Sequence, residues 1–350
     1  MPQDEHHSYE AETVIGLEKL AAQELHRAPW GAFVQKGGVR PGAVRFEYRR
    51  SIETLNDLRL AQAVYRVLHF DVSRPKALLG HASFRQLTTS IVEVLNAMPE
   101  GAFKTLGIDA AGADSSVMQR IKRDLSAAVG LAPAQEDRGD LLVRIIPAVA
   151  GAGWECLVRL TPRPLATRRW RSLNFAAALN ATVAQAMVQL VSPKAEDVFV
   201  NLCCGSGSLL IEGVTSGVNA THFLGIDIDE DTLRIARLNI LHANLKVPVQ
   251  LCVGDAQHSP LADRSVTALV ADLPFGQRSG SHRENIALYP RVLGEAARIA
   301  RSETLFAILT HELRLMEDVL TGQQDWQLAD MLPIVLRGLH PRIYLLRRLP

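Results

Sequence analysis

The stretch of sequence that decides the fold lies at residues 198–207 and reads V-F-V-N-L-C-C-G-S-G. Its apolar and β-favouring residues predict a strand, and Gly205 and Gly207 predict a turn. The run S-L-L-I-E that follows begins a helical pattern. This order suits a small anionic or nucleotide-like ligand, because glycine lets the backbone approach it and a helix N-terminus presents free N–H groups. The same order also occurs where nothing binds, so the stretch alone does not identify a ligand site.

Acidic residues end the next three predicted strands. They are Asp227, Asp255 and Asp272, which end or follow the strands predicted at residues 222–227, 249–254 and 266–271. Together with the strand that precedes the glycine turn, four successive strands carry polar residues at their ends. This arrangement predicts the ligand-binding edge of a doubly wound sheet. Asp227 stands 20 residues after Gly207, a spacing at which it could hold the hydroxyls of a ribose or cap the following helix. The sequence leaves both roles open.

Two cofactor classes fit such an edge. Dinucleotide-binding folds carry G-x-G-x-x-G, and this chain has Leu210 where the third glycine would stand. The stretch at residues 272–278 decides between the classes, because it reads D-L-P-F-G-Q-R. It resembles the (D/N)-x-P-(F/Y) motif of S-adenosylmethionine-dependent methyltransferases that act on exocyclic or side-chain amino groups.

The residue types of this motif suit methyl transfer to the amino group of a base. The lone pair of such an amine is delocalised into the ring, so the group is a poor nucleophile. The Asp272 carboxylate and the backbone carbonyls of a turn stiffened by Pro274 can accept hydrogen bonds from the N–H groups of the amine. Phe275 can stack on an extruded base. An ordinary type I turn would account for Asp, Pro and Gly but not for Phe275. The motif therefore predicts Asp272, Pro274 and Phe275 as catalytic residues.

Charge is distributed unevenly along the chain. The 350 residues carry a formal net charge of +1, so the whole chain gives no sign of a polyanionic partner. Residues 156–195, however, contain no Asp or Glu, and residues 163–171 read R-P-L-A-T-R-R-W-R. Arginines beside an aromatic ring suit contacts with phosphates and bases. Trp170 could equally hold a linker against the domain that follows, and both roles are open.

Neither a metal site nor a membrane span is predicted. The four cysteines, two of them adjacent, lack the spacing of a disulfide framework or a metal site, so a reducing cytoplasm is the simplest compartment. Residues 172–193 are uncharged, but Thr182, Gln185 and Gln189 recur at helical spacing. They predict a buried amphipathic helix instead of a membrane helix.

The chain length predicts two or three domains. Residues 8–70 read as a small α/β unit with a helical period at residues 52–67, and residues 83–161 read as a second unit. From about residue 174 onward strands and helices alternate, and a final strand at residues 341–346 has no helix after it. This count predicts an α/β fold with a Rossmann-like sheet of seven mostly parallel strands, the last inserted as a hairpin.

Together these stretches resemble the THUMP-domain RNA guanosine N2-methyltransferases, most closely the members that modify the acceptor stem of tRNA. The glycine turn is common to all class I methyltransferases, so the likeness depends mainly on residues 272–289 and 338–344. Further likenesses lie at residues 13–18, 165–171, 179–184 and 201–208.

The resemblance implies a domain order and a reaction. Residues 8–70 would be a ferredoxin-like unit, 71–161 a THUMP RNA-binding domain, 162–173 a basic linker and 174–350 the class I methyltransferase domain. The first two would grip the 3′ end of a tRNA. The last would transfer a methyl group from S-adenosyl-L-methionine to the exocyclic N2 of an acceptor-stem guanosine, the m2G6 type. The protein is expected to be a cytoplasmic monomer without a metal, and the need for a helper subunit is left open.

The resemblance also assigns site residues. Asp227 would hold the cofactor ribose, Asp255 the adenine amino group, and Asp272 with Phe275 the flipped guanine. The residues implied at the cofactor are Asn180, Thr182, Asn201, Cys203, Gly205, Gly207, Asp227, Ile228, Asp255, Ala256 and Asp272. The residues implied at the RNA are Arg163, Arg168, Arg169, Trp170, Arg171 and Arg278.

Three positions depart from the pattern of the family. Asn201 replaces the acid that commonly starts the glycine turn, Leu273 replaces the first proline of the usual pair, and Ala181 replaces a proline. Asn201 removes a negative charge near the cationic end of the cofactor, which predicts lower affinity. Three other functions stay open: an S-adenosylmethionine-binding RNA adaptor or chaperone without activity, an rRNA guanine-N2 methyltransferase, and an NAD-dependent oxidoreductase.

Overall fold

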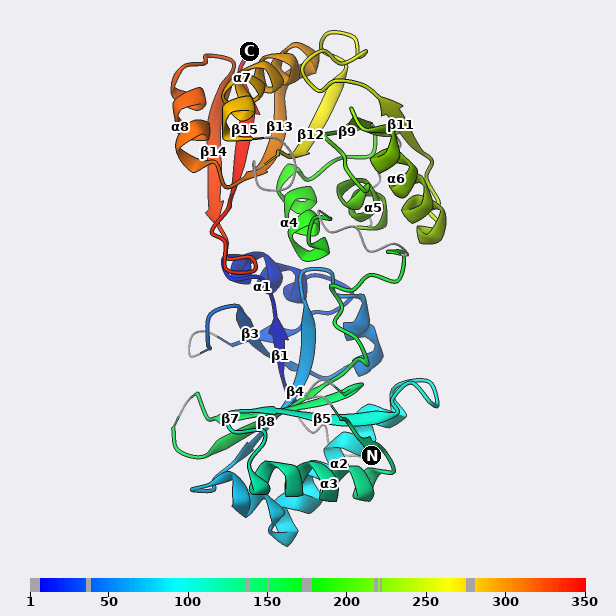
Figure 1. Cartoon of the computed structure of the whole chain (residues 1–350), viewed down its shortest axis with the longest axis vertical. Helices are drawn as coiled ribbons and strands as arrows, with labels where there is room; N and C mark the ends of the chain where they lie inside the picture. The colour runs from blue at the N-terminus through cyan, green and yellow to red at the C-terminus, as the bar shows by residue number, and fades with distance from the viewer. Residues whose placement is uncertain are drawn as a thin grey trace. The chain divides into compact units, whose positions relative to one another are not determined.

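The computed structural model of the protein describes residues 7–35, 39–135, 139–149, 151–171, 178–216, 220, 222–274 and 281–350. The chain forms two compact units (Figure 1). The first comprises Met1–Thr13 and Glu18–Ala166, and the second comprises Val14–Leu17 and Thr167–Pro350.

The first unit is built on one sheet of eight strands in the order β2-β3-β1-β4-β8-β7-β5-β6. The strands are β1 (His7–Glu12), β2 (Phe33–Val34), β3 (Ala43–Tyr48), β4 (Ala63–Phe70), β5 (Thr105–Ala110), β6 (Ala132–Pro133), β7 (Leu141–Pro147) and β8 (Trp154–Arg159). The helices are α1 (Glu18–His26), α2 (His81–Asn96) and α3 (Ser116–Val129), with 3-10 helices η1 (Ile52–Asp57) and η2 (Pro75–Leu79). Because β4 pairs with β8, residues 8–70 and 83–161 share a single sheet.

The prediction of a helix at residues 52–67 is wrong. Only η1 is helical there, and Ala63–Phe70 form strand β4. The sequence of this strand, A-V-Y-R-V-L-H-F, is rich in β-branched and aromatic residues, and residues 63–67 are all buried. A strand between β1 and β8 that is buried on both faces does not show the two-residue alternation of a half-exposed strand. Its apolar run therefore resembles a helical period when only the sequence is considered.

A buried cluster of ion pairs ties three strands of the first unit together. Glu10 on β1 is fully buried, and its carboxylate accepts hydrogen bonds from the guanidinium groups of Arg40 and Arg45. The distance from Arg45 Nη2 to Glu10 Oε2 is 2.9 Å, and Arg45 Nη2 also lies 3.0 Å from Oε2 of Glu155 on β8. Each carboxylate therefore has a partner that offsets the cost of taking its charge out of water.

The second unit is built on a sheet of seven strands in the order β11-β10-β9-β12-β13-β15-β14. The strands are β9 (Val198–Leu202), β10 (His222–Asp227), β11 (Val249–Val253), β12 (Val266–Asp272), β13 (Ala300–Thr310), β14 (Trp326–Pro333) and β15 (Arg342–Arg348). The first five strands of this order pair in parallel, and β15 lies antiparallel between β13 and β14. The predicted seven-stranded sheet with an inserted last strand is confirmed.

In the described part of the second unit, the helices that pack around this sheet are α4 (Ala181–Val191), α5 (Ser208–Thr215), α6 (Glu230–Ala243), α7 (His282–Ile299) and α8 (Leu313–Thr321). Helix α4 packs against α5, and α7 packs against α8 (Figure 1). Most residues of α4 are buried, including Thr182 and Gln185 of the polar stripe. Within the described residues, no helix is long and apolar enough to cross a membrane.

A short N-terminal segment completes the second unit. Ile15 forms an antiparallel bridge with Val335, whose N–H donates to the Ile15 carbonyl at 3.0 Å. Gly16 has a φ of +97°, and a Cβ built there would lie 2.1 Å from the carbonyl oxygen of Pro333. Only glycine fits this close approach. The segment Val14–Leu17 is thereby held against the connection between β14 and β15.

Candidate active site

A cavity of about 1100 Å³ lies at the C-terminal ends of β9, β10, β11 and β12. The strand order reverses between β9 and β12, which is where ligands bind in sheets of this type. The predicted residues that line the cavity are Asn180, Cys203, Gly205, Asp227, Ile228, Asp255, Ala256, Asp272 and Pro274.

The glycine turn after β9 is shaped for a ligand at Gly205. This residue has a φ of +54°, and a Cβ built on it would meet no atom within 4 Å. The backbone there borders open space and can approach a bound molecule closely. Beside it, burial raises the pKa of the Cys203 thiol to about 12, with smaller contributions from nearby aspartates. This thiol is therefore protonated at neutral pH and lines the cavity as a neutral group.

Asn201 and Gly207 lie near the turn but outside the lining of the cavity. The Asn201 side chain is fully buried, and its amide donates to the carbonyls of Leu202 and Val270 at 3.0 and 3.2 Å. It thus ties β9 to β12. A Cβ on Gly207 would lie 3.3 Å from Cβ of Ala236, so this glycine allows α5 and α6 to pack closely.

Asp227 closes the glycine turn and also faces the cavity. Its Oδ2 accepts a hydrogen bond from the Gly205 N–H at 2.7 Å, and its Oδ1 accepts one from the Asp229 N–H at 3.1 Å. The cap of helix α6 is Asp229, which accepts from the Asp231 N–H at 3.0 Å. Of the two roles left open for Asp227, helix capping therefore belongs to a neighbour. A carboxylate has about four lone-pair sites, so Asp227 can accept further hydrogen bonds from a ligand.

The remaining predicted cofactor residues differ in their access to the cavity. Asp255 lines it, and Oδ1 of Asp255 accepts from the Gln257 N–H at 2.9 Å, which orients the carboxylate. Asn180 lines the cavity and caps α4 by accepting from the N–H of Thr182 at 2.9 Å. The Thr182 side chain is fully buried and does not reach the cavity. A direct side-chain contact between Thr182 and a ligand is therefore not supported.

Asp272 is an acid of the site with a strongly raised pKa. It ends β12 and lines the cavity, and its buried Oδ1 has no hydrogen-bond partner in the part of the chain that the structure describes. Burial raises the pKa of this carboxyl from 3.8 to about 7. An unpaired carboxylate is costly to bury, and strongly perturbed carboxyls of this kind cluster at functional sites.

Pro274 presents its carbonyl to the protein interior. The carbonyl oxygen accepts hydrogen bonds from Nδ2 of Asn285 and from the hydroxyl of Tyr289, both at 2.9 Å. Phe275 and Arg278, the other predicted residues of this motif, lie outside the described residues.

The basic linker contributes mainly structural contacts. Arg168 pairs at 2.9 Å with the fully buried carboxylate of Glu212, and Arg171 donates to the Leu179 carbonyl at 2.8 Å and to Ser208 Oγ at 3.0 Å. Trp170 is buried, and burial lowers the pKa of Arg171. These three side chains hold the linker in the second unit, and their contact with RNA stays a prediction. Arg163 and Arg169 are exposed.

Residues 168–340 match the family described as UPF0020, RMKL-like, methyltransferase domain. The match spans the glycine turn and all three cavity-lining acids that end strands. These residues are an RMKL-like methyltransferase domain. The assignment of residues 71–161 as a THUMP domain stays a prediction.

Relatives of the chain are named as tRNA methyltransferases. The chain is 32% identical over 187 residues to tRNA (guanine(6)-N(2))-methyltransferase THUMP3 of Bos taurus, which covers 49% of this chain and 36% of that protein. The match therefore spans little more than a third of the bovine protein. A tRNA (guanine(6)-N2)-methyltransferase of Thermus thermophilus is 27% identical over 234 residues, covering 67% of this chain and 68% of that protein. The crystal structure of TrmN from Thermus thermophilus has the same fold, with a TM-score of 0.76, 23% identity, and coverage of 98% of this chain and 100% of that chain.

The cavity of the methyltransferase domain is also lined by residues that the sequence does not predict. His311 directly follows β13, so extending the strand-end argument to a fifth strand would have found it. Leu336, Arg337 and Leu339 belong to the hairpin between β14 and β15. Leu336 and Leu339 exchange backbone hydrogen bonds across Arg337 and Gly338, both with positive φ. Gly338 suits the positive φ of a two-residue hairpin turn, but no local sequence pattern indicates that the turn borders the cavity.

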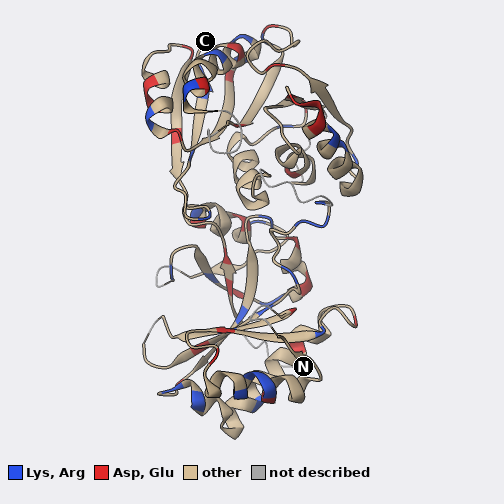
Figure 2. Ribbon diagram, in the orientation of Figure 1, with Lys and Arg blue, Asp and Glu red and all other residues tan. Residues whose placement is uncertain are grey.

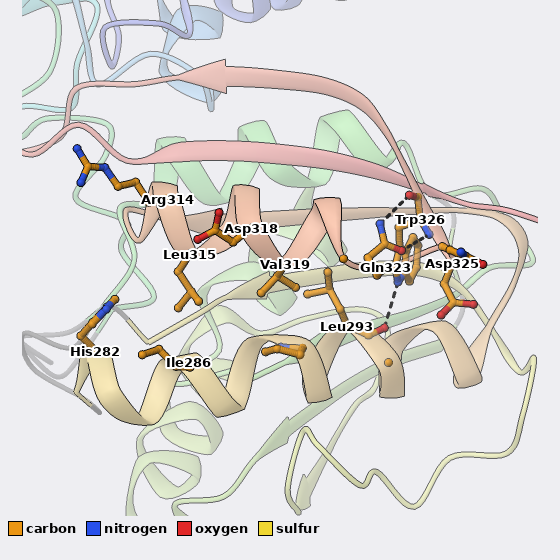
Figure 3. Close-up of a pocket in the computed structure, with 14 residues that line it drawn as sticks. His282, Ile286, Leu293, Arg314, Leu315, Asp318, Val319, Gln323, Asp325 and Trp326 are labelled. Atoms are coloured by element: carbon orange, nitrogen blue, oxygen red, sulfur yellow. Dashed lines mark hydrogen bonds between the residues drawn. The ribbon is translucent and has the colours of Figure 1, made fainter.

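A second cavity of the methyltransferase domain lies between α7 and α8 and has a volume of about 930 Å³ (Figure 3). Apolar side chains from both helices line it, including Ile286, Leu293, Leu315 and Val319. At one end Trp326 donates from Nε1 to the Leu293 carbonyl at 3.1 Å. The two cavities share no lining residue in the described ranges, and only the first collects the acids at the strand ends. The first cavity is therefore the candidate active site.

Proposed function

We propose that the protein transfers a methyl group from S-adenosyl-L-methionine to the exocyclic N2 of a guanosine in tRNA, within the acceptor stem. The observation that carries the proposal is Asp272, a carboxylate with an unpaired buried oxygen at the same cavity as the glycine turn. The names of the bovine and Thermus relatives, both tRNA guanine N2-methyltransferases, support this substrate.

The cavity residues fit the cofactor. Gly205 leaves open space beside the backbone of the turn, and Asp227 keeps lone pairs for the two ribose hydroxyls. Asp255 is oriented by Gln257 and can accept the adenine amino group. Asn201, which replaces an acid, lies outside the cavity, so this departure removes no cofactor ligand from it. Bound S-adenosylmethionine would supply a methyl group activated by a cationic sulfur.

Asp272 has two tasks in the proposed reaction. In its ionised form, the carboxylate accepts a hydrogen bond from an N–H of the guanine amino group. This hydrogen bond favours a geometry in which the nitrogen lone pair is not delocalised into the ring and can attack the methyl group. The amine must lose a proton when its bond to the methyl group forms. With a pKa of about 7, the Asp272 carboxylate is basic enough to hold that proton at neutral pH.

The first unit is proposed to hold the tRNA by its 3′ end. Figure 2 shows Lys and Arg gathered on α3, where Arg120 and Arg123 are exposed. Arg163 and Arg169 are likewise exposed in the linker. Contacts between such side chains and phosphates supply affinity and orientation without reading the sequence.

The test is incubation with S-adenosylmethionine labelled in its methyl group and either total tRNA or rRNA, followed by nucleoside analysis. We expect label in N2-methylguanosine from tRNA. Label in rRNA alone would contradict the substrate. Cofactor binding without transfer to any RNA would favour an adaptor instead.

A further inference from the structure

Two side chains of helix α7 hold Pro274, a described residue of the turn predicted after Asp272. Asn285 and Tyr289 are four residues apart and therefore lie on the same face of the helix. Both are fully buried, and each donates a hydrogen bond of 2.9 Å to the same atom, the carbonyl oxygen of Pro274. A carbonyl oxygen has two lone pairs, and both are used here. This oxygen therefore anchors the turn and is not an acceptor for a substrate amine.

We propose that Tyr289 and Asn285 are positioning residues of the methyl transfer. By holding the Pro274 carbonyl they fix the turn and, two residues before it, the carboxylate of Asp272. This inference rests on the proposed function. Active-site groups displaced by about 1 Å can lose on the order of 10² in rate, so a turn freed at one end should lower turnover without affecting folding to the same extent.

The hydrogen bonds of Tyr289 have a defined direction. Its hydroxyl has one hydrogen, which it donates to Pro274, so the hydroxyl of Thr310 at 2.7 Å must donate to Tyr289. Thr310 Oγ1 in turn accepts from the N–H of Glu312 at 3.0 Å. Burial raises the pKa of Tyr289, which keeps its hydroxyl protonated and able to donate at any physiological pH.

Asn285 is held by Glu312, the residue whose N–H also contacts Thr310. Its second amide hydrogen points to Oε1 of Glu312 at 3.4 Å, and Oε2 of Glu312 lies 2.9 Å from Nδ1 of His282. The two sets of hydrogen bonds thus meet at Glu312, one at its backbone N–H and one at its carboxylate. In addition, the Leu273 N–H donates to the Leu309 carbonyl at 3.1 Å. The end of β13 and helix α7 therefore hold the turn after β12 from two sides.

The decisive variant is Tyr289→Phe, which removes the hydroxyl and keeps the ring. We expect kcat for tRNA methylation to fall about 10- to 100-fold, while the Kd for S-adenosylmethionine and the KM for tRNA change by less than about threefold. Tyr344→Phe is the matched control, because Tyr344 is also buried in the methyltransferase domain and does not line the cavity. It should keep the kcat of the wild type. Rates are normalised to the protein that binds S-adenosylmethionine, so that a loss of folded protein is not counted as a loss of kcat.

A second pair of variants keeps the test informative if Tyr289→Phe folds poorly. Thr310→Ser retains the hydroxyl that donates to Tyr289 and should keep nearly full kcat, whereas Thr310→Val removes it and should lower kcat in the same way as Tyr289→Phe. Equal normalised kcat values for Tyr289→Phe and the wild type, or for both Thr310 variants and the wild type, would overturn the positioning role and leave the proposed function intact. A wild-type protein that binds the cofactor but methylates no tRNA would overturn both.

Discussion

Glu10 in the first unit and Asp272 in the second are both acids on inner strands of a sheet, yet their surroundings differ. Glu10 is fully buried and receives hydrogen bonds from two guanidinium groups. Asp272 has a buried oxygen without a partner among the described residues, and its pKa is raised to about 7. The comparison separates an acid whose charge stabilises the fold from one whose charge is left available for chemistry.

The largest effect is expected from Asp272→Ala. Loss of a positioned acceptor for the amine should lower the rate of transfer by about 10² to 10⁴. Binding of cofactor and RNA should remain nearly unchanged, because neither is assigned to this side chain alone. Single-turnover methylation together with calorimetry on the same preparation measures both. A parallel loss of cofactor affinity would mean that Asp272 belongs to the cofactor pocket and not to the transfer step.

Glu10→Ala should act on stability instead. Removing one partner of a buried ion pair typically costs about 3 to 5 kcal/mol. We expect the lower end, because Arg45 keeps Glu155 as a partner and Arg40 is partly exposed. The free energy of unfolding of the first unit in urea gives the value. A loss of less than about 1 kcal/mol in the free energy of unfolding, the range of surface ion pairs, would mean that the ion pairs of Glu10 stabilise the fold no more than surface pairs do.

Asp272→Asn should stabilise the folded protein, in contrast to Glu10→Ala, and it should do so only at high pH. The pKa of Asp272 is raised in the folded protein, so between pH 3.8 and about 7 the folded state binds a proton that the unfolded state releases. Its contribution to stability is therefore lost as the pH rises through this window. Above pH 7 the asparagine variant should be more stable by about 1 to 3 kcal/mol, a figure lowered because the side chain faces the cavity. At pH 4 the two proteins should unfold alike, and thermal unfolding at both pH values tests this.

The smallest effects extend the comparison to the linker cations. Arg163→Ala and Arg169→Ala remove exposed charges and should flatten the dependence of log K for RNA on log salt by about one unit each. Arg168→Ala leaves the buried Glu212 carboxylate without this partner and should lower stability instead. Binding titrations at several salt concentrations, paired with unfolding curves, distinguish the two classes. An unchanged salt slope in the first two variants would remove the linker from the RNA-binding surface.

The sequence predicts the second sheet better than the first for a physical reason. Parallel strands buried on both faces give clear apolar runs, and each acid at their ends marks the same edge of the sheet. In the first unit, β4 pairs with β8 across about ninety residues, from Tyr65 to Arg159, and no local pattern encodes such a pairing. The boundary expected near residue 70 therefore lies inside a continuous sheet.

The site shows the same limit. Strand ends located Asp227, Asp255 and Asp272, because that argument needs only the order of elements. Charge alone could not separate Arg168 from Arg169, since the partner of Arg168 is a buried carboxylate 44 residues away. The hydroxyl of Tyr289 likewise acquires its role only when α7 packs beside the turn after β12.

The bridge between Ile15 and Val335 makes the second unit discontinuous in sequence. Val335 adjoins Leu336, which lines the cavity, so four residues that interrupt the sequence of the first unit support a wall of the candidate active site. A break at the linker would therefore separate the second unit from a segment that pairs with it. A second unit that began at residue 167 would lack Gly16 and its close approach to Pro333, and so would be missing part of its own compact unit.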